Sequence, residues 1–328
     1  MPFVLTDDNY NYISIYFCKY NVTTALLIAF IAAHASKCAI IYSMSKSIDE
    51  LTQISWRTRA RVLRMIRAAG SGHLASSLGS SDIFTYFYHN VLNLHPGPTV
   101  FAERDYFLLS AGHLCPAWYA TLSECGFFAP EHLLTLRQFG SPLQGHPHRQ
   151  VELGIENIAG PLGQGLSMAA GLALARQRAG SQQKVFVLSS DGEQQEGQVW
   201  EAYLFAAHYR LANLLVIIDV NRIQQSGLVR QVMNLGDLAA KLQSFGFAVC
   251  ECDGHDFADL AAKYSELASV SDKPQCLLCR TVPGKGISLL EGDALWHAAQ
   301  PTDQQWGEIF AELADKLTAA GVDLKELI

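Results

Sequence analysis

Short apolar runs alternate with longer amphipathic runs along most of the chain. Charged and apolar residues recur at helical spacing over residues 45–69, and Gly70 then predicts the end of that helix. Beyond it, nearly continuous apolar runs of strand length are separated by runs of helical period. The predicted strands are 106–109, 184–189, 214–219, 247–252 and 275–282. The predicted helices are 115–125, 165–178, 197–209, 237–245 and 256–267.

Alternating strands and helices with apolar strands predict an α/β fold, in which a parallel sheet carries helices on both faces. In such sheets ligands bind beyond the carboxyl ends of the strands. Polar and glycine-rich segments follow the predicted strands at 110–113, 190–192, 219–221, 253–255 and 283–286. We therefore expect the functional groups to gather along one edge of one sheet.

Charge and cysteine content narrow the function. The 328 residues carry 24 Lys and Arg against 31 Asp and Glu, with no basic stripe interleaved with aromatic residues, which argues against a nucleic-acid partner. The eight cysteines are too few for a disulfide scaffold in a chain of this length, and reduced thiols in the cytoplasm fit better. Cys276 and Cys279 have CxxC spacing, but they lie within a predicted strand, so a redox or zinc role is disfavoured.

The first 43 residues differ from the rest. Residues 21–36 are uncharged and largely apolar, yet short for a membrane span of about 20 residues. A signal peptide or anchor, an added helix, and a translation start at Met44 are the three interpretations. A signal peptide typically begins with basic residues, whereas here Asp7 and Asp8 precede the apolar stretch. We favour Met44 as the start of a single domain, residues 44–328, and expect no membrane association.

Oxygen ligands stand at the ends of two predicted strands, thirty positions apart. Asp191 and Asn221 offer a carboxylate and an amide, a ligand set that suits Mg²⁺ or Ca²⁺. Gly192 allows the backbone to approach a ligand, and the helix predicted to begin at Gly197 directs its positive end to the same edge. An Asp-Gly pair after a strand is, by itself, more often a solvent turn.

The paired segments resemble the fingerprint of thiamine diphosphate (ThDP) enzymes, a Gly-Asp-Gly followed about thirty residues later by Asn. Ser190 replaces the first glycine here. The resemblance implies a diphosphate-binding (PP-type) domain. It also implies that the metal takes the Asp191 carboxylate, the Asn221 side chain and the backbone carbonyl of Ile223.

Further segments are similar in order and spacing to those of transketolases. They cover residues 55–300 and are Ser71-Gly-His73, Gly112-His113, Gly145-His146-Pro147, Gly160-Pro-Leu-Gly-Gln-Gly165 and Asp253-Gly-His255-Asp256. Transketolases belong to the pentose phosphate pathway and move a two-carbon ketol unit between sugar phosphates. The cofactor is the electron sink, while the protein holds it and handles protons. Histidine suits the proton work because its ordinary pKa is near 6.5.

The resemblance assigns a role to each residue of this set. His73 and His146 would face substrate hydroxyls and carbonyl, and His113 would lie between the diphosphate and the reacting carbon. Backbone groups of Gly160 and Leu162 would meet the aminopyrimidine. By the same resemblance, the Gly192 N–H would donate to the diphosphate, and Glu196 would lie at a subunit interface.

The C-terminal part departs from the family. Transketolases carry a His-x-x-His-Gly-Ala-Pro run, and here Ala294 stands for the first histidine while His297 remains. Either His297 reaches the site, or the donor-binding end is altered and the usual sugar phosphates are in doubt.

The pyrimidine-binding domain of these enzymes is expected in a separate chain. Only about forty residues follow Ile287, too few for another α/β domain. The resemblance therefore implies the N-terminal subunit of a split transketolase, inactive alone and joined to a C-terminal subunit in an α2β2 heteromer. The alternatives are a split ThDP enzyme for a branched, sulfonated or deoxy sugar phosphate, and a non-catalytic cofactor-binding subunit. The Ser71–His73 and Gly145–Pro147 segments argue against a dehydrogenase E1 α-subunit.

Overall fold

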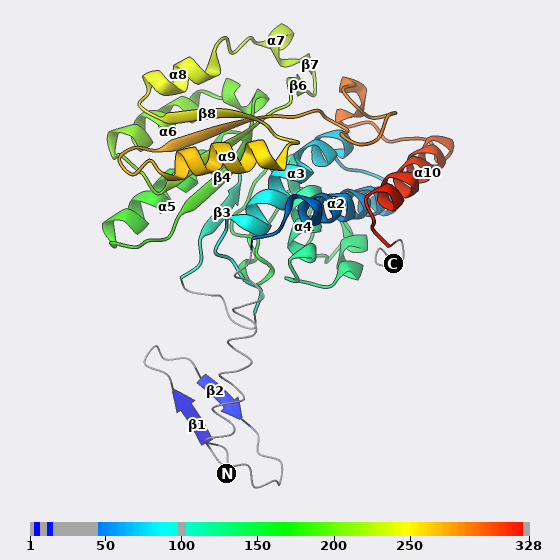
Figure 1. Ribbon diagram of the computed structural model, residues 1–328, viewed down its shortest axis with the longest axis horizontal. Coiled ribbons are helices and arrows are strands. Elements are labelled where there is room, and N and C mark those ends of the chain that lie inside the picture. Colours follow the sequence, from blue (N-terminus) through cyan, green and yellow to red (C-terminus); the bar gives the residue numbers. More distant parts are fainter. Residues whose placement is uncertain (1–2, 7–11, 16–44, 98–102, 324–328) are drawn as a thin grey trace. The chain divides into compact units, whose positions relative to one another are not determined.

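The computed structural model describes residues 3–6, 12–15, 45–97 and 103–323 (Figure 1). The chain divides into two compact units, residues 1–44 and 45–328. In the first unit, β1 (Phe3–Thr6) pairs antiparallel with β2 (Tyr12–Ile15). The apolar stretch 21–36 lies outside the described residues, so the start at Met44 stays a prediction. None of the described helices is both long and apolar enough to cross a membrane.

The second unit is built on a five-stranded sheet in which all described neighbours pair in parallel. Its spatial order is β3-β4-β5-β9-β8. The strands are β3 (Tyr106–Leu109), β4 (Val185–Ser190), β5 (Leu214–Val220), β8 (Ala248–Asp253) and β9 (Gln275–Arg280). Every predicted strand is present, and each end lies within two residues of its predicted position. The predicted parallel sheet is confirmed.

Helices cover both faces of the sheet, as predicted (Figure 1). One face packs against α2 (Ile48–Ala69), α3 (Leu74–Asn90), α4 (Cys115–Glu124) and α9 (Phe257–Ala268). The other packs against α5 (Gln164–Arg178), α6 (Gly197–His208) and α8 (Leu238–Ser244). Successive side chains of a strand alternate between these two cores, because side chains of a strand point to opposite faces in turn.

The CxxC pair follows the same alternation. Cys276 packs in the core beneath α5 and α6, whereas Cys279 packs in the core beneath α3 and α9, where its Sγ lies 3.6 Å from that of Cys252. Both thiols are buried, and burial raises the pKa of Cys279 above its ordinary value. Because the two cysteines face opposite sides of the sheet, they do not form one metal or redox site.

Local sequence explains where the first helix begins and ends. Ser47 and Glu50 form a capping box at the start of α2, and Gly70 ends it in the left-handed region at φ 63°. Two long helices of the described chain were missed by the sequence pattern. Residues 74–88 of α3 are all buried, so no polar face marks the helix. The second, α10 (Asp303–Ala319), begins with a capping box between Thr302 and Gln305 that sequence could have revealed.

Shorter elements complete the loops. The 3₁₀ helices are η1 (Gly112–Leu114), η2 (Pro130–Thr135), η3 (Val151–Leu153), η4 (Gly192–Gln195) and η5 (Ala294–His297). After β5 come β6 (Ile223–Gln224), β7 (Gly227–Leu228) and α7 (Val229–Val232). Several of these elements lie at the carboxyl edge of the sheet and shape the site described below.

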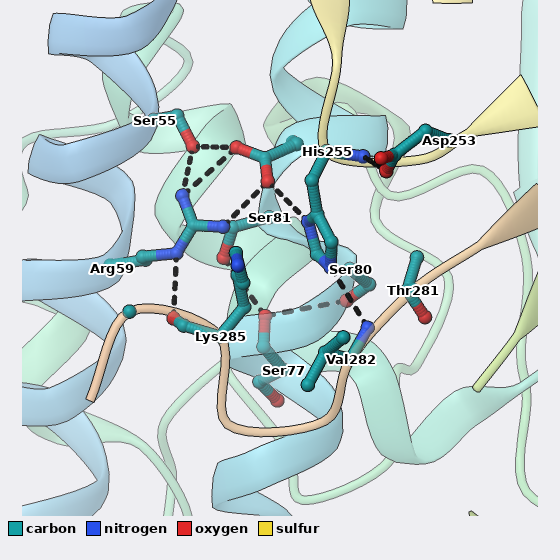
Figure 2. Close-up of polar contacts among 12 residues, drawn as sticks. Ser55, Arg59, Ser77, Ser80, Ser81, Asp253, His255, Thr281, Val282 and Lys285 are labelled. Carbon is teal, nitrogen blue, oxygen red and sulfur yellow. Dashed lines mark hydrogen bonds and ion pairs between the residues drawn. The ribbon is translucent and has the colours of Figure 1, made fainter. Parts of the chain in front are cut away.

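A buried ion pair ties α2 to α3. The Arg59 guanidinium donates to both Asp82 carboxylate oxygens, at 2.9 and 2.6 Å, and Ser55 and His255 bind the same carboxylate. Figure 2 shows Arg59, Ser55 and His255 converging at this point. Burial would raise the pKa of Asp82, but the Arg59 charge and the His255 hydrogen bond outweigh it and hold the pKa well below its usual range.

Asp82→Ala is expected to lower the free energy of unfolding by about 3–5 kcal/mol, because it leaves a buried guanidinium without its partner. Urea unfolding followed by circular dichroism measures this. Asp303→Ala is the matched control, since it removes the exposed pair between Arg67 and Asp303. That loss should be much smaller, because exposed ion pairs contribute little. Equal losses would contradict the structural role given to the Asp82 pair.

Candidate functional site

The ends of β4 and β5 bring the predicted metal ligands together. Ser190 lies opposite Asp219 in the parallel register, and the Asp191 N–H donates to the Asp219 carbonyl at 3.0 Å. Asp191 and Asn221 therefore leave two adjacent strands at the same level of the sheet. This is the juxtaposition that the thirty-residue spacing predicted.

The Asp191 carboxylate is buried among backbone donors. Its side chain accepts from the N–H of Gly192 at 2.8 Å and from the N–H of Arg222 at 2.7 Å, and the residue is 3% exposed. Burial raises its pKa to about 7, and the charge of neighbouring Asp219 adds to the rise. Two close, buried carboxylates are costly unless a cation compensates them. The residues therefore fit a divalent metal ion.

Binding of Mg²⁺ is expected to weaken as the pH falls below about 7. The folded pKa of Asp191 is raised, so the carboxylate that would ligate the cation becomes protonated below that pH. Each further pH unit should then cost roughly tenfold in affinity. Calorimetric titration of Mg²⁺ in the presence of ThDP at pH 5.5, 6.5 and 8 measures the trend. An affinity that does not change with pH in wild-type protein would contradict it.

A tight turn carries the other two predicted ligands. Arg222 adopts φ 65°, a left-handed conformation that is rare outside glycine, and it turns the chain directly between Asn221 and Ile223. The Asn221 Oδ1 accepts from the Ile223 N–H at 2.9 Å. Within the described part of the chain, no group of three or more His, Cys, Asp or Glu side chains is placed to hold a metal ion. A cation at Asp191 would therefore depend on amide and backbone oxygens as well.

A cavity of 370 Å³ opens at this edge of the sheet. Every predicted site residue except the buried Asp191 lines it. The lining residues are His73, His113, His146, Gly160, Leu162, Ser190, Gly192, Glu193, Gln195, Glu196, Asn221, Ile223, Gln224, Gln225, Ser226 and His297. Residues from distant parts of the sequence thus share one cavity, which is lined by two of the predicted cation ligands, Asn221 and Ile223, and by the predicted proton-handling histidines.

Four histidines form a cluster in this cavity. The His73 ring lies 5.2 Å from that of His113, 6.1 Å from that of His146 and 5.4 Å from that of His297, between ring centroids. His73 precedes α3, His113 lies in η1, His146 follows a loop glycine, and His297 ends η5. The buried Nδ1 of His73 has no hydrogen-bond partner among the described residues. It is free to bind a ligand group.

Burial keeps these imidazoles neutral. It lowers the pKa of His73 to about 4, with smaller contributions from His297, His146 and Arg137. Burial and the neighbouring rings lower the pKa of His113 well below its usual value, and burial also lowers those of His146 and His297. A neutral imidazole accepts a proton or donates its one N–H, so the cluster can bind hydroxyl and carbonyl groups near neutral pH.

His297 reaches the cavity although Ala294 replaces the family histidine. Its ring lies 5.4 Å from that of His113, and its Nδ1 lies 3.3 Å from the Ser76 hydroxyl of α3. Ala294 begins the same 3₁₀ helix but does not line the cavity. Of the two alternatives left open by the sequence, the first, in which His297 reaches in, agrees with this placement.

Glu193 is a site residue that sequence reasoning missed. It is completely buried, accepts from the hydroxyls of Ser110 and Ser189 at 2.6 Å each, and accepts from the Gly163 N–H at 2.6 Å. One carboxylate thus holds three strand-end and loop segments around the cavity. Nothing in the local pattern reveals this, because a glutamate beside Asp-Gly looks like a surface residue.

The glycine-rich loop at 160–165 packs very closely on the β3 end. A Cβ on Gly165 would lie 2.5 Å from the Ser110 Cβ, and a Cβ on Gly112 would lie 3.0 Å from Ala159. The Leu162 carbonyl accepts from the Gln198 side chain at 2.8 Å, and the Gly192 N–H is directed at Asp191. Glu196 is exposed where η4 meets α6. The roles given to these groups toward cofactor and partner stay predictions.

The histidine of the Asp253-Gly-His255-Asp256 segment does not join the cluster. Its Nδ1 lies 2.7 Å from the Asp82 carboxylate, and its Nε2 accepts from the Val282 N–H at 2.8 Å (Figure 2). His255 therefore connects α3 to the segment that leaves β9. It lines a different cavity from that of the four clustered histidines.

The parallel sheet and the site at its carboxyl edge define the class, an α/β protein with the thiamine-diphosphate-binding fold. A family model described as the transketolase, thiamine diphosphate binding domain matches residues 52–313. The chain belongs to the transketolase family, whose members are ketol-transferring transferases. The resemblance seen in the motifs is confirmed.

Several relatives are similar over most of this chain. One subunit of the apulose-4-phosphate transketolase of Phocaeicola vulgatus is 36% identical over 82% of this chain and 96% of its own length. The 6-deoxy-6-sulfo-D-fructose transketolase subunit SqwG of a Clostridium species is 34% identical over 80% of this chain and 97% of its own length. Human transketolase is 30% identical over 83% of this chain but 44% of its own length.

Solved structures agree with these matches. The crystal structure of transketolase from Campylobacter jejuni superposes with a TM-score of 0.74 at 29% identity, over 85% of this chain and 44% of that one. Transketolase from Leishmania mexicana gives a TM-score of 0.75 at 26% identity, with 84% and 44% covered. The chain thus corresponds to a little under half of these transketolases and to nearly all of the relatives named as subunits.

Proposed function

We propose that this chain is the N-terminal subunit of a split transketolase. Together with a separate pyrimidine-domain subunit, in an α2β2 heteromer, it transfers a two-carbon ketol unit from a ketose phosphate to an aldose phosphate with ThDP and Mg²⁺. The main support is the shared cavity, because Asn221 and Ile223, which follow β5, line it together with the four-histidine cluster. The six cysteines of the described residues form no disulfide, which supports a cytoplasmic setting.

Each part of the cavity has a task in this proposal. Asp191, Asn221 and the Ile223 carbonyl would hold the cation, whose charge would offset that of the diphosphate. ThDP, when bound, supplies the electron sink for cleavage of the C–C bond. In the proposed arrangement His113 lies between the diphosphate and the reacting carbon. His73, His146 and His297 bind substrate oxygens, and their lowered pKa values keep the rings unprotonated at neutral pH, so that a ring nitrogen can accept a hydrogen bond from a substrate hydroxyl.

A non-standard sugar phosphate is the second candidate for the substrate. Two observations favour it over the usual sugars: Ala294 replaces a family histidine, and two similar subunits are named for apulose 4-phosphate and 6-deoxy-6-sulfo-D-fructose. A purely cofactor-binding role is disfavoured, because a subunit that only held the cofactor would have no need for all four histidines around one cavity.

Purified alone, this chain is expected to show no ketol transfer, because the pyrimidine-binding domain that completes the active site is assigned to the partner. Co-expression with the neighbouring reading frame, followed by assay against a panel of ketose phosphates that includes branched and sulfonated sugars, should restore turnover and identify the donor. The control is the same pair with Asp191→Ala in this chain. Turnover by this chain without any partner would contradict the split arrangement.

A further inference from the structure

The Asn221 amide has two ends, and only one of them can bind a cation. Its oxygen is a metal ligand, whereas its NH₂ group is a donor that repels a cation. A rotation of about 180° about the last side-chain bond exchanges the two. The cation site therefore requires something that distinguishes the oxygen from the nitrogen. This requirement rests on the metal site of the proposed function.

Asp219 makes that distinction. It is completely buried in β5, and its Oδ2 accepts from the Asn221 Nδ2 at 3.2 Å. A carboxylate only accepts, so it fixes the nitrogen on its own side. The Asn221 Oδ1 then points away from Asp219 and accepts from the Ile223 N–H. Because an N–H can donate only to an acceptor, this contact also requires the oxygen in that position.

Thr281 in turn holds Asp219. Its hydroxyl donates to the other carboxylate oxygen, Oδ1, and its N–H donates to the Val220 carbonyl at 3.3 Å. Both Asp219 oxygens are thus engaged by side-chain donors. We propose that Asp219 and Thr281 are positioning residues that set the Asn221 amide with its oxygen toward the cation.

The segment that carries Thr281 is itself fixed to the helices. The next residue, Val282, donates its N–H to His255 Nε2, which makes Nδ1 the protonated nitrogen that donates to Asp82. The Val282 carbonyl lies against Gly79 of α3, where a Cβ would come within 2.9 Å. Figure 2 shows Thr281 and Val282 beside His255. Thr281 therefore has a rigid support, which a positioning residue needs.

The test measures metal affinity directly. Mn²⁺ is titrated into the full chain in the presence of saturating ThDP and the partner subunit, while free Mn²⁺ is followed by electron paramagnetic resonance. Thr281→Val keeps the volume and the Asp219 charge but removes the hydroxyl, and we expect Mn²⁺ affinity to fall about tenfold. Thr281→Ser restores the hydroxyl and should restore the affinity. Thr281→Ala repeats the test with a smaller side chain should the valine variant not fold.

The outcomes separate this inference from the metal assignment itself. The positioning role is supported if Thr281→Val loses Mn²⁺ affinity and Thr281→Ser recovers it. The two variants differ in the hydroxyl group, so the recovery would assign the effect to that group and not to a general loss of stability. The positioning role alone is overturned if folded Thr281→Val or Thr281→Ala binds Mn²⁺ with wild-type affinity while Asp191→Ala does not. Wild-type affinity in Asp191→Ala overturns the metal site and with it the basis of the inference.

Discussion

Asp191→Ala is expected to abolish Mg²⁺-dependent binding of ThDP. The change removes the one carboxylate of the proposed ligand set, a buried group whose oxygens accept hydrogen bonds from the N–H groups of Gly192 and Arg222. The loss should exceed about a hundredfold, since removing even a residue that merely supports a metal ligand typically costs roughly 10–100-fold in affinity. Calorimetric titration of ThDP with and without Mg²⁺ measures it.

The matched control is Asp272→Ala. It removes the same charge from an exposed position before β9, so its ThDP affinity should equal that of the wild type. Asp191→Asn is a closer comparison, because it keeps the size and one oxygen and should retain a small part of the affinity. Unchanged affinity in Asp191→Ala would show that the cation and the diphosphate bind elsewhere.

The sheet and the position of the site could be predicted from the sequence for a physical reason. Strands of a covered parallel sheet are apolar on both faces, so they appear as short apolar runs, and the polar residues that follow them gather at one edge. Leu214–Val220 illustrates this, because Asn221 comes directly after a run whose residues are nearly all buried. The proposed metal ligands and the histidines of the cluster were then identified from family motifs.

The parts that sequence missed depend on contacts between distant residues. The α3 helix shows no polar face because protein surrounds it on all sides. Buried hydrogen bonds join Glu193 to Ser110 and Thr281 to Asp219, and in each pair the partners are far apart in the sequence. The residues next to them in the sequence do not indicate these partners. His255 belonged to a recognised motif, yet its ring binds Asp82 rather than the cavity. A buried hydrogen bond is a property of the fold, and local pattern does not encode it.

His73→Ala is expected to lower kcat/KM of the assembled enzyme by about 10²–10⁴-fold, the usual contribution of a positioned acid or base. The His73 ring lies among the other three histidines, and its pKa of about 4 keeps it neutral from pH 5 to 8. A neutral ring with a free buried nitrogen suits a substrate hydroxyl. ThDP affinity should stay close to wild type, because His73 is not among the proposed cation ligands.

His132→Ala is the control for His73, since it removes an exposed imidazole in η2 that does not line the cavity. Both variants lose an imidazole, but only the ring of His73 lines the cavity. A fall in ThDP affinity equal to the fall in kcat/KM would mean that His73 supports the cofactor rather than the substrate. Full activity in His73→Ala would remove this ring from the mechanism. The pH profile of the rate adds a further test. A ring that is neutral above about pH 4 does not make the rate fall on the acidic side near pH 6.5. Replacing His73 should therefore lower the rate at every pH without moving the acidic limb of the profile.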